Sequence, residues 1–163
     1  MGRNKKTQSG FTLIELLVSI SIIAILTSLL TVNFIGARQR GRDGQRKANL
    51  YNIQSALELY RSDNEQYPTT ADFPTCGHAL TNPTSGATYM QKVPCDPLSS
   101  ATSYKYVAEP SAPSVCDNLV PGTPCTSFEL YACLENTGDQ DSNIDPDSKG
   151  VAGCDIPFKL TNP

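Results

Sequence analysis

The apolar positions in the first third of the chain form one continuous segment. Between residues 11 and 35 the only charged side chain is Glu15, and most other positions are Leu, Ile, Val, Ser or Thr. A helix of this length extends about 37 Å, which is enough to cross a bilayer with some tilt. Soluble core helices are rarely apolar on every face over such a length. The pattern therefore predicts a membrane-spanning helix over residues 11–35.

A second helical pattern follows over residues 36–62, where apolar residues recur on one face only. The members of this stripe are Leu50, Ile53, Leu57 and Tyr60. Their spacing is that of an amphipathic helix. Asp43 also stands four residues before Lys47, a spacing that favours an ion pair along one helix. Pro68 cannot continue the helix, so we expect the helix to end a few residues before it.

The remainder of the chain is rich in Pro, Thr, Ser, Asn and Asp, a composition that predicts short strands joined by turns. Three segments are strand candidates: residues 103–107, 128–134 and 156–160. In the second, Phe128, Leu130 and Ala132 alternate with Glu129 and Tyr131. One face of a small antiparallel sheet would then cover the amphipathic stripe. The expected fold class is α+β, with a long N-terminal helix, transmembrane and then amphipathic, packed on this sheet.

Composition and charge narrow the possible functions. The chain has 163 residues, 18% of them charged, and a formal net charge of -3, which is not the balance of a disordered or nucleic-acid-binding tail. The single histidine, His78, lies in a turn-like context without a nucleophile signature, and no phosphate-binding or dinucleotide-binding motif is present. We therefore expect neither an enzyme nor a nucleic-acid partner. The basic residues between 38 and 47 favour contact with lipid headgroups or with other subunits.

The cysteines indicate an oxidising compartment, because six occur in a small chain and all follow Pro68. This places the C-terminal part outside the cytoplasm and the N-terminus inside it. Six cysteines allow fifteen pairings, and the sequence alone cannot choose among them. The simplest assignment is sequential: Cys76 with Cys95, Cys116 with Cys125, and Cys133 with Cys154. A metal–thiolate site is the weaker alternative, because the chain has no C-x-x-C motif and one histidine.

The start of the chain differs from an ordinary secretory signal. The first ten residues are basic and contain no acid. A secretory signal has its small-residue cleavage site after the apolar run, whereas here the best junction, Gly10–Phe11, precedes it. Cleavage there would leave the apolar helix on the product. Glu15 would cost a few kcal/mol among apolar residues in lipid, and we expect no partner for it on its own helix. The Phe11 ammonium of a neighbouring subunit could supply one and fix the stagger between subunits.

The segment SGFTLIELL resembles the processing signal of type IV prepilins and of the pseudopilins of type II secretion systems. The resemblance implies that a prepilin peptidase cleaves after Gly10 and methylates the amino group of Phe11. It also implies that Glu15 takes part in assembly. The later segments RKANLYNIQSALELYRSDNEQYPTT, YMQKVPCDP, SYKYV and FELYACLEN resemble the major pseudopilin of these systems.

The resemblance implies four segments: a leader (1–10), a filament-core helix (11–35), its amphipathic continuation (36–62) and an extracytoplasmic head (63–163). The chain is then the structural subunit of a type IV-pilus-like filament, closest to the major pseudopilin. Implied partners are other copies, the prepilin peptidase, an inner-membrane assembly platform, minor pilins or pseudopilins, and lipid before assembly. The implied location is the inner membrane, crossed once, and then a periplasmic or surface filament.

Two alternatives stay open. Six cysteines are unusual for a major pseudopilin, which leaves a type IV pilus subunit for adhesion, motility or DNA uptake. A membrane-anchored extracytoplasmic binding module that never polymerises is the other.

The acidic loop between Cys133 and Cys154 contains alternating oxygen side chains: Asp139, Asp141, Asn143, Asp145 and Asp147. Such side chains can converge on a hard cation such as Ca²⁺. The start is similar to an EF-hand loop, but Ile144 and Gly150 stand where that loop has its Gly and its final Glu. The resemblance to the major pseudopilin implies calcium here, bound by Asp139, Asp141, Asn143 and Asp145. The alternative is a solvated loop of Asx turns.

Overall fold

The computed structural model describes residues 10–110, 116, 123–142 and 154–162. The chain divides into two compact units, residues 1–38 and 39–163. The seven strands of the described residues all belong to the second unit. The helical part of the described residues is α1 (Leu13–Asn64), which is continuous through the boundary between the units. This confirms a long N-terminal helix followed by small antiparallel sheets, the α+β class expected from the sequence.

The C-terminal end of α1 is set by its last residues. Glu65 has a φ of 60°, in the left-handed region, and its N–H donates to the Arg61 carbonyl at 2.7 Å. The Asn64 side chain donates to the Tyr60 carbonyl at 2.6 Å. A left-handed residue directly after the last helical residue is a common way to end a helix, because it turns the chain away from the axis. The helix therefore extends two residues beyond the predicted end at residue 62.

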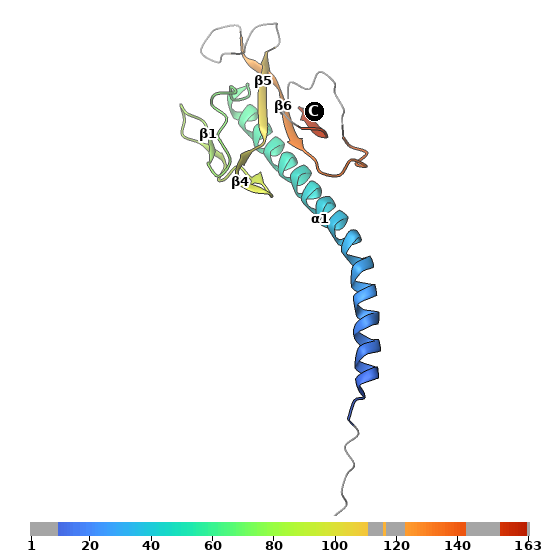
Figure 1. Cartoon of the computed structure of the whole chain (residues 1–163). Helices are drawn as coiled ribbons and strands as arrows, with labels where there is room; N and C mark the ends of the chain where they lie inside the picture. The colour runs from blue at the N-terminus through green and yellow to red at the C-terminus, as the bar shows by residue number, and fades with distance from the viewer. Residues whose placement is uncertain (1–9, 111–115, 117–122, 143–153, 163) are drawn as a thin grey trace, which may run out of the picture. The chain divides into compact units, whose positions relative to one another are not determined.

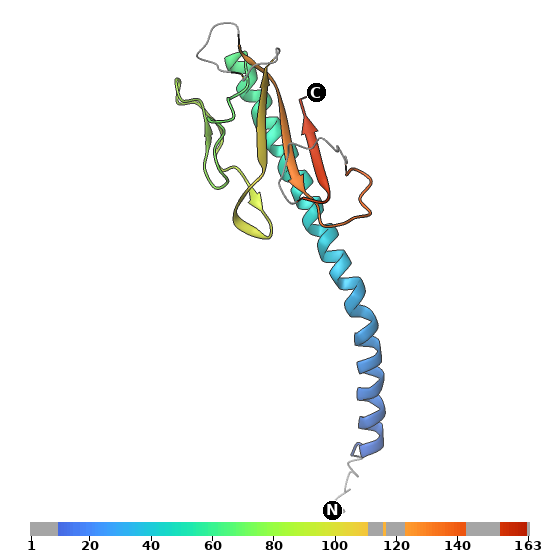
Figure 2. The same ribbon diagram turned by 45° about the horizontal axis from the view of Figure 1, so that its top comes forward.

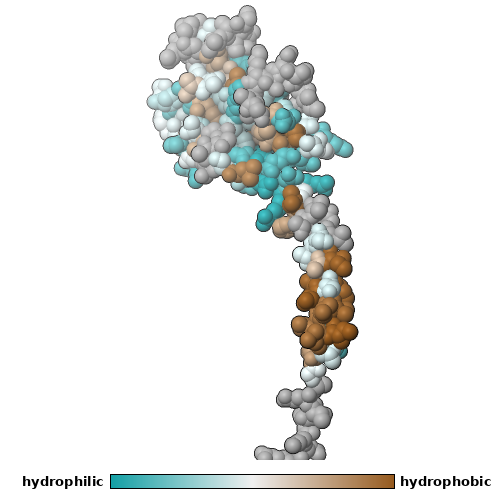
Figure 3. All heavy atoms as spheres, in the orientation of Figure 1, coloured by the Kyte–Doolittle hydropathy of each residue, from teal (hydrophilic) through white to brown (hydrophobic). Residues whose placement is uncertain are grey.

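The first unit exposes its apolar side chains. Phe11, Leu13 and Ile14 are all highly exposed, and the apolar surface continues along α1 to Leu26 (Figure 3). Within the described residues no helix reaches the length and hydropathy that a bilayer crossing requires. The expected span over residues 11–35 includes residues 29–33, whose side chains lie outside the described part of the chain. The membrane-spanning assignment therefore stays a prediction.

The main sheet of the second unit has three antiparallel strands in the order β5-β6-β7 (Figures 1 and 2). Their bounds are Lys105–Pro110 for β5, Cys125–Cys133 for β6 and Pro157–Thr161 for β7. In the register of this sheet, the central residue Leu130 of β6 pairs with Tyr106 on one side and Leu160 on the other. Two small antiparallel pairs complete the unit. They are β1 (Leu80–Thr81) with β2 (Thr88–Met90), and β3 (Cys95–Asp96) with β4 (Ser99–Ser103).

The strand predictions were right in number of main strands and less accurate at their ends. The segment expected at 103–107 joins the end of β4 to the start of β5, with Tyr104 between the two strands. β6 begins three residues before the expected position, and β7 is shifted by one residue. The small pairs β1–β2 and β3–β4 were missed, since β1, β2 and β3 have only two or three residues and β4 has no large apolar residue that could alternate with polar ones.

The core of the second unit lies between the stripe on α1 and the main sheet. Leu50, Ile53 and Leu57 are fully buried and belong to one hydrophobic cluster with Phe128 and Leu130 of β6. The sheet lies along this part of α1 in both ribbon views (Figures 1 and 2). The predicted packing of the amphipathic stripe on the alternating face of the sheet is therefore confirmed.

Three disulfides tie the loops of the second unit together: Cys76–Cys95, Cys116–Cys125 and Cys133–Cys154. They correspond to the sequential pairing. The first joins the segment before β1 to β3, the second holds residue 116 against the start of β6, and the third joins the end of β6 to the segment before β7. The ends of the acidic loop are thereby linked, with their Cα atoms 5.6 Å apart.

Candidate functional site

The expected processing segment begins the described part of the chain. Gly10 and Phe11 are exposed and precede α1, while Glu15 lies in its first turn. Glu15 Oε2 accepts hydrogen bonds from the Thr12 N–H and from the Thr12 hydroxyl, each at 2.8 Å. In return, the Glu15 N–H donates to Thr12 Oγ1 at 3.3 Å. This reciprocal arrangement is a capping box, in which two side chains satisfy free N–H groups at the helix start.

The statement that Glu15 has no partner on its own helix is therefore wrong. The signal was present in the sequence, since Thr12 stands three residues before Glu15 in the spacing of a capping box. A contact between Glu15 and the Phe11 ammonium of another subunit stays a prediction, and it would have to compete with the Thr12 hydrogen bonds.

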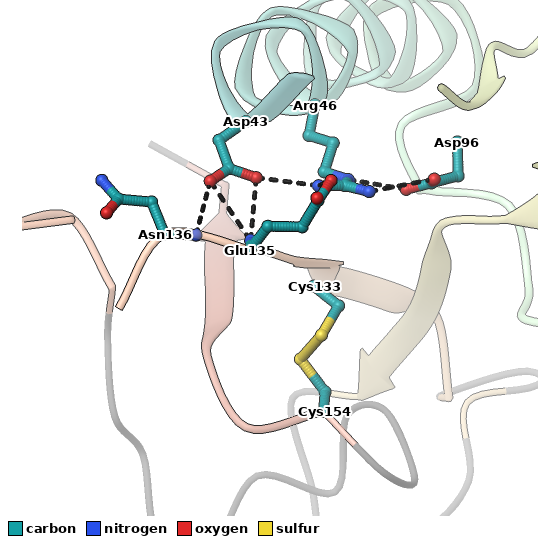
Figure 4. Close-up of a disulfide and its surroundings, with 7 residues drawn as sticks. All are labelled: Asp43, Arg46, Asp96, Cys133, Glu135, Asn136 and Cys154. Carbon is teal, nitrogen blue, oxygen red and sulfur yellow. Dashed lines mark hydrogen bonds and ion pairs between the residues drawn. A yellow bond between two sulfur atoms is a disulfide. The ribbon is translucent and has the colours of Figure 1, made fainter. Parts of the chain in front are cut away.

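A second polar feature lies in the second unit, where α1 meets the start of the acidic loop (Figure 4). We refer to it as the charged cluster, and its members are Arg42, Asp43, Arg46, Asp96 and Glu135. Asp43 is 1% exposed and Arg46 is 3% exposed. Charged groups at this depth are stable only when they are paired and hydrogen-bonded. Each buried charged group of the cluster therefore needs an ion-pair partner and hydrogen bonds within the cluster.

Asp43 holds the backbone that follows β6. Its Oδ1 accepts from the Glu135 N–H at 2.9 Å, and its Oδ2 accepts from the Asn136 N–H at 2.9 Å. Arg46 Nη1 donates to Asp43 Oδ1 at 2.8 Å. One buried carboxylate thus satisfies two backbone N–H groups and one guanidinium. The result is a fixed attachment of the first residues of the acidic loop to α1 (Figure 4).

Arg46 joins α1 to two other segments. Its guanidinium donates to both carboxylate oxygens of Asp96 in β3, at 2.7 and 3.1 Å, and to Glu135 Oε1 at 2.7 Å. Arg42 also makes a two-point contact with Glu135. The hydrogen bonds from Arg42, followed by those from Arg46, outweigh the effect of burial and lower the pKa of Glu135 to about 2. Burial acts to raise the pKa of Asp96, but the hydrogen bonds from Arg46 and others lower it overall.

Two of the predicted metal ligands lie together at a lysine of α1. Lys47 Nζ donates to Asp139 Oδ1 at 2.6 Å and to Asp141 Oδ2 at 2.8 Å. The expected pair of Asp43 with Lys47 is therefore wrong, since Asp43 pairs with Arg46 instead.

The oxygen donors of Asp139 and Asp141 fit a hard cation, and both already contact one positive charge. Asn143 and Asp145, the other two predicted ligands, lie outside the described residues, as does Asp147. No group of three His, Cys, Asp or Glu side chains able to hold a metal occurs in the described part of the chain.

The basic stretch thus has a role that its sequence did not reveal. Arg42, Arg46 and Lys47 all pair with carboxylates of their own chain. The expected contact of the stretch with headgroups or other subunits stays a prediction. The partners of these three residues in β3 and in the acidic loop are 50 to 94 residues away in sequence. Helical spacing cannot identify such distant partners, because only the fold brings them together.

Two family models match the chain. The first, the prokaryotic N-terminal methylation motif, matches residues 5–31. The second, protein G of the type II secretion system, matches residues 33–120. The first match includes Gly10, Phe11 and Glu15. The second includes Asp96 and the three members of the charged cluster that lie on α1.

Several curated relatives carry the name type II secretion system core protein G. The relative from Klebsiella pneumoniae is 34% identical over 57% of this chain and 71% of its own length. The relative from Pseudomonas aeruginosa is 29% identical over 86% of this chain and 95% of its own. The relative from Aeromonas hydrophila is 39% identical over 40% of this chain, so the match spans 46% of that protein. No solved structure matches the chain significantly.

Proposed function

Since the chain belongs to the family of protein G of the type II secretion system, we propose that it is the structural subunit of a pseudopilus-like filament. The observation that carries this proposal is the combination of motif and exposed apolar surface in the first unit. A methylation motif leads directly into a helix whose described apolar side chains, from Leu13 to Leu26, face outward. Such a surface needs lipid or other apolar side chains to cover it.

The proposal assigns two environments to this surface in turn. Before assembly, residues 11–35 span the inner membrane once, with residues 1–10 in the cytoplasm. After cleavage by the prepilin peptidase, the helices of several copies cover one another in the filament core, and the disulfide-linked second unit lies outside the membrane. An inner-membrane platform and minor pseudopilins complete the set of partners. The work of extraction from lipid has to come from such partners, since the chain carries no nucleotide-binding motif.

The proposal is tested by the N-terminus of the native product. Mass spectrometry of the protein from its own host should identify an N-terminal peptide that begins at Phe11 and carries one methyl group on its amino nitrogen. A mature chain that begins at Met1, or beyond Ile35, would contradict the proposal, because the helix would then be unprocessed or absent.

Glu15→Ala is expected to abolish filament assembly while leaving the protein in the membrane. The physical reason is that a carboxylate surrounded by apolar side chains gains more from the Phe11 ammonium of a neighbour than from two neutral hydrogen bonds. Filament yield after shearing, compared with the amount of membrane-bound subunit, measures the effect.

Thr12→Ala is the matched control, since it removes the hydroxyl that caps Glu15 and leaves the carboxylate in place. Its filament yield should stay near that of the unmodified protein. Equal losses in the two variants would instead show that Glu15 acts only as a helix cap.

We also propose that the acidic loop binds calcium, with Asp139 and Asp141 among the ligands. Two features support this proposal: both side chains supply oxygen donors, and both carboxylates converge on one point, where they contact the Lys47 ammonium. Addition of calcium at about 100 times its Kd to the full chain in detergent should stabilise the second unit by about 2.7 kcal/mol, and chelation should reverse this. A melting temperature that responds to neither would remove calcium from the proposal.

A type IV pilus subunit is the second candidate, and the three disulfides favour it because they are unusual for a major pseudopilin. Long surface filaments released by shearing intact cells would support this candidate. Filaments confined to the periplasm would support the pseudopilus.

A further inference from the structure

The ammonium group of Lys47 lies between two carboxylates of the acidic loop. Its Nζ is 2.6 Å from Asp139 Oδ1 and 2.8 Å from Asp141 Oδ2. The side chains of Lys47 and Asp139 are largely buried, while Asp141 is exposed. Nζ also lies 5.5 Å from the ring centre of Phe158. α1 therefore supplies a fixed positive charge to the described part of this loop.

Asp139 is positioned by hydrogen bonds within the acidic loop as well as by Lys47. The Asp139 N–H donates to the Asn136 carbonyl at 3.1 Å. The Asp141 N–H donates to Asp139 Oδ1 at 2.9 Å, and the Ser142 hydroxyl donates to the Asp139 carbonyl at 2.8 Å. These bonds do not involve the lysine. We therefore expect Asp139 to keep its orientation when the ammonium is removed.

Two cations cannot use this pair of carboxylates at once. A calcium ion needs its oxygen ligands at about 2.3–2.6 Å, which places it close to the position that the ammonium occupies. A unit charge and a double charge about 4 Å apart repel strongly at a partly buried site. Hydrogen bonds between Lys47 and the two aspartates would also have to break before the carboxylates could turn to a metal.

We infer that Lys47 is an internal cation that closes the acidic loop onto α1, and that a divalent cation can bind Asp139 and Asp141 only by displacing it. The inference does not depend on filament assembly. Calcium binding and attachment of the loop by Lys47 then compete.

The test is calcium titration by calorimetry on the full chain in detergent micelles at fixed ionic strength, which limits differences in screening. Lys47→Gln removes the internal cation, and the calcium Kd should fall by about tenfold or more because no ammonium has to be displaced. Lys47→Arg keeps a positive charge and should bind calcium no more tightly than the unmodified chain. Lys159→Gln removes the lysine of a separate pair with Glu129, at similar exposure, and should leave the Kd within about twofold of the original.

A second readout is the melting temperature of the same variants. Without calcium, Lys47→Gln should melt below the unmodified chain, and calcium should raise its melting temperature by more than that of the unmodified chain. Equal calcium affinity in Lys47→Gln and the unmodified chain would overturn the inference and leave the calcium proposal standing. Absence of calcium binding in both would overturn the inference and the calcium proposal together, while the filament proposal would be unaffected.

Discussion

Replacing Asp43 by alanine is expected to lower the free energy of unfolding of the second unit by about 3–5 kcal/mol, because it breaks a buried ion pair from one side. The carboxylate accepts the N–H groups of Glu135 and Asn136 as well as Arg46 Nη1. Asp43 and Arg46 are almost fully buried, so the substitution leaves the Arg46 guanidinium and the two N–H groups without this acceptor. Chemical denaturation of the full chain in detergent, followed by tyrosine fluorescence, measures the change, because the chain has no Trp.

Two variants serve as controls for Asp43→Ala. Asp63→Ala removes an exposed carboxylate from the same helix and should change the free energy of unfolding by less than about 0.5 kcal/mol. Asp43→Asn keeps one acceptor oxygen but loses the charge that faces Arg46, so its loss should be intermediate. A loss below about 1 kcal/mol for Asp43→Ala would show that the loop is held mainly by its other contacts.

The same cluster predicts how stability depends on pH. The pKa of Glu135 is lowered to about 2 from an ordinary value of 4.5. A carboxyl group with a lowered pKa in the folded state stabilises the fold fully above its ordinary pKa, and the contribution is lost as the pH falls toward the folded value. Asp96 acts in the same direction. Loss of the second unit's stability between about pH 4.5 and 2 should therefore be smaller in Glu135→Gln.

Replacing both Cys133 and Cys154 by serine is expected to lower the free energy of unfolding by about 3 kcal/mol, because the unfolded chain gains the conformational entropy that the closed loop had removed. The bond joins positions 21 residues apart. It lies beside the last paired residues of the sheet, where Cys133 pairs with Pro157 and the Leu134 N–H donates to the Ile156 carbonyl. The disulfide and Asp43 therefore restrain the same short segment after β6, from two directions (Figure 4).

Because the two restraints act on the same segment, we expect the effects of removing the Cys133–Cys154 disulfide and of Asp43→Ala to be coupled. Combined with Asp43→Ala, the total loss should be smaller than the sum of the separate losses by at least about 0.5 kcal/mol, since either change alone already releases the segment. Cys116→Ser with Cys125→Ser is the control, because that disulfide joins positions 9 residues apart and neither cysteine is next to a member of the charged cluster in the chain. Its loss should add to that of Asp43→Ala. Strict additivity for both pairs would contradict a joint restraint at residues 133–136.

Local patterns in the sequence were sufficient for the long helix and the sheet. The amphipathic stripe from Leu50 to Tyr60 and the alternation around Leu130 are both periodic, and periodicity alone indicates which face of an element is buried. The sequential disulfide pairing also corresponds to the structure. The processing segment is a contiguous motif, so Gly10, Phe11 and Glu15 could be found without any knowledge of the fold.

Only the tertiary structure decided how the charges of α1 are used. The spacing of Asp43 and Lys47 suggested one pair on the helix surface, yet each has partners from other segments. Arg46 reaches Asp96 and Glu135 because β3 and the end of β6 pack beside α1. A pairing rule within a helix extends over four residues, whereas these partners are 50 or more residues away. The sequence by itself thus determined the long helix, the main sheet and the processing motif, and the packing of the sheet on the helix determined which charges meet.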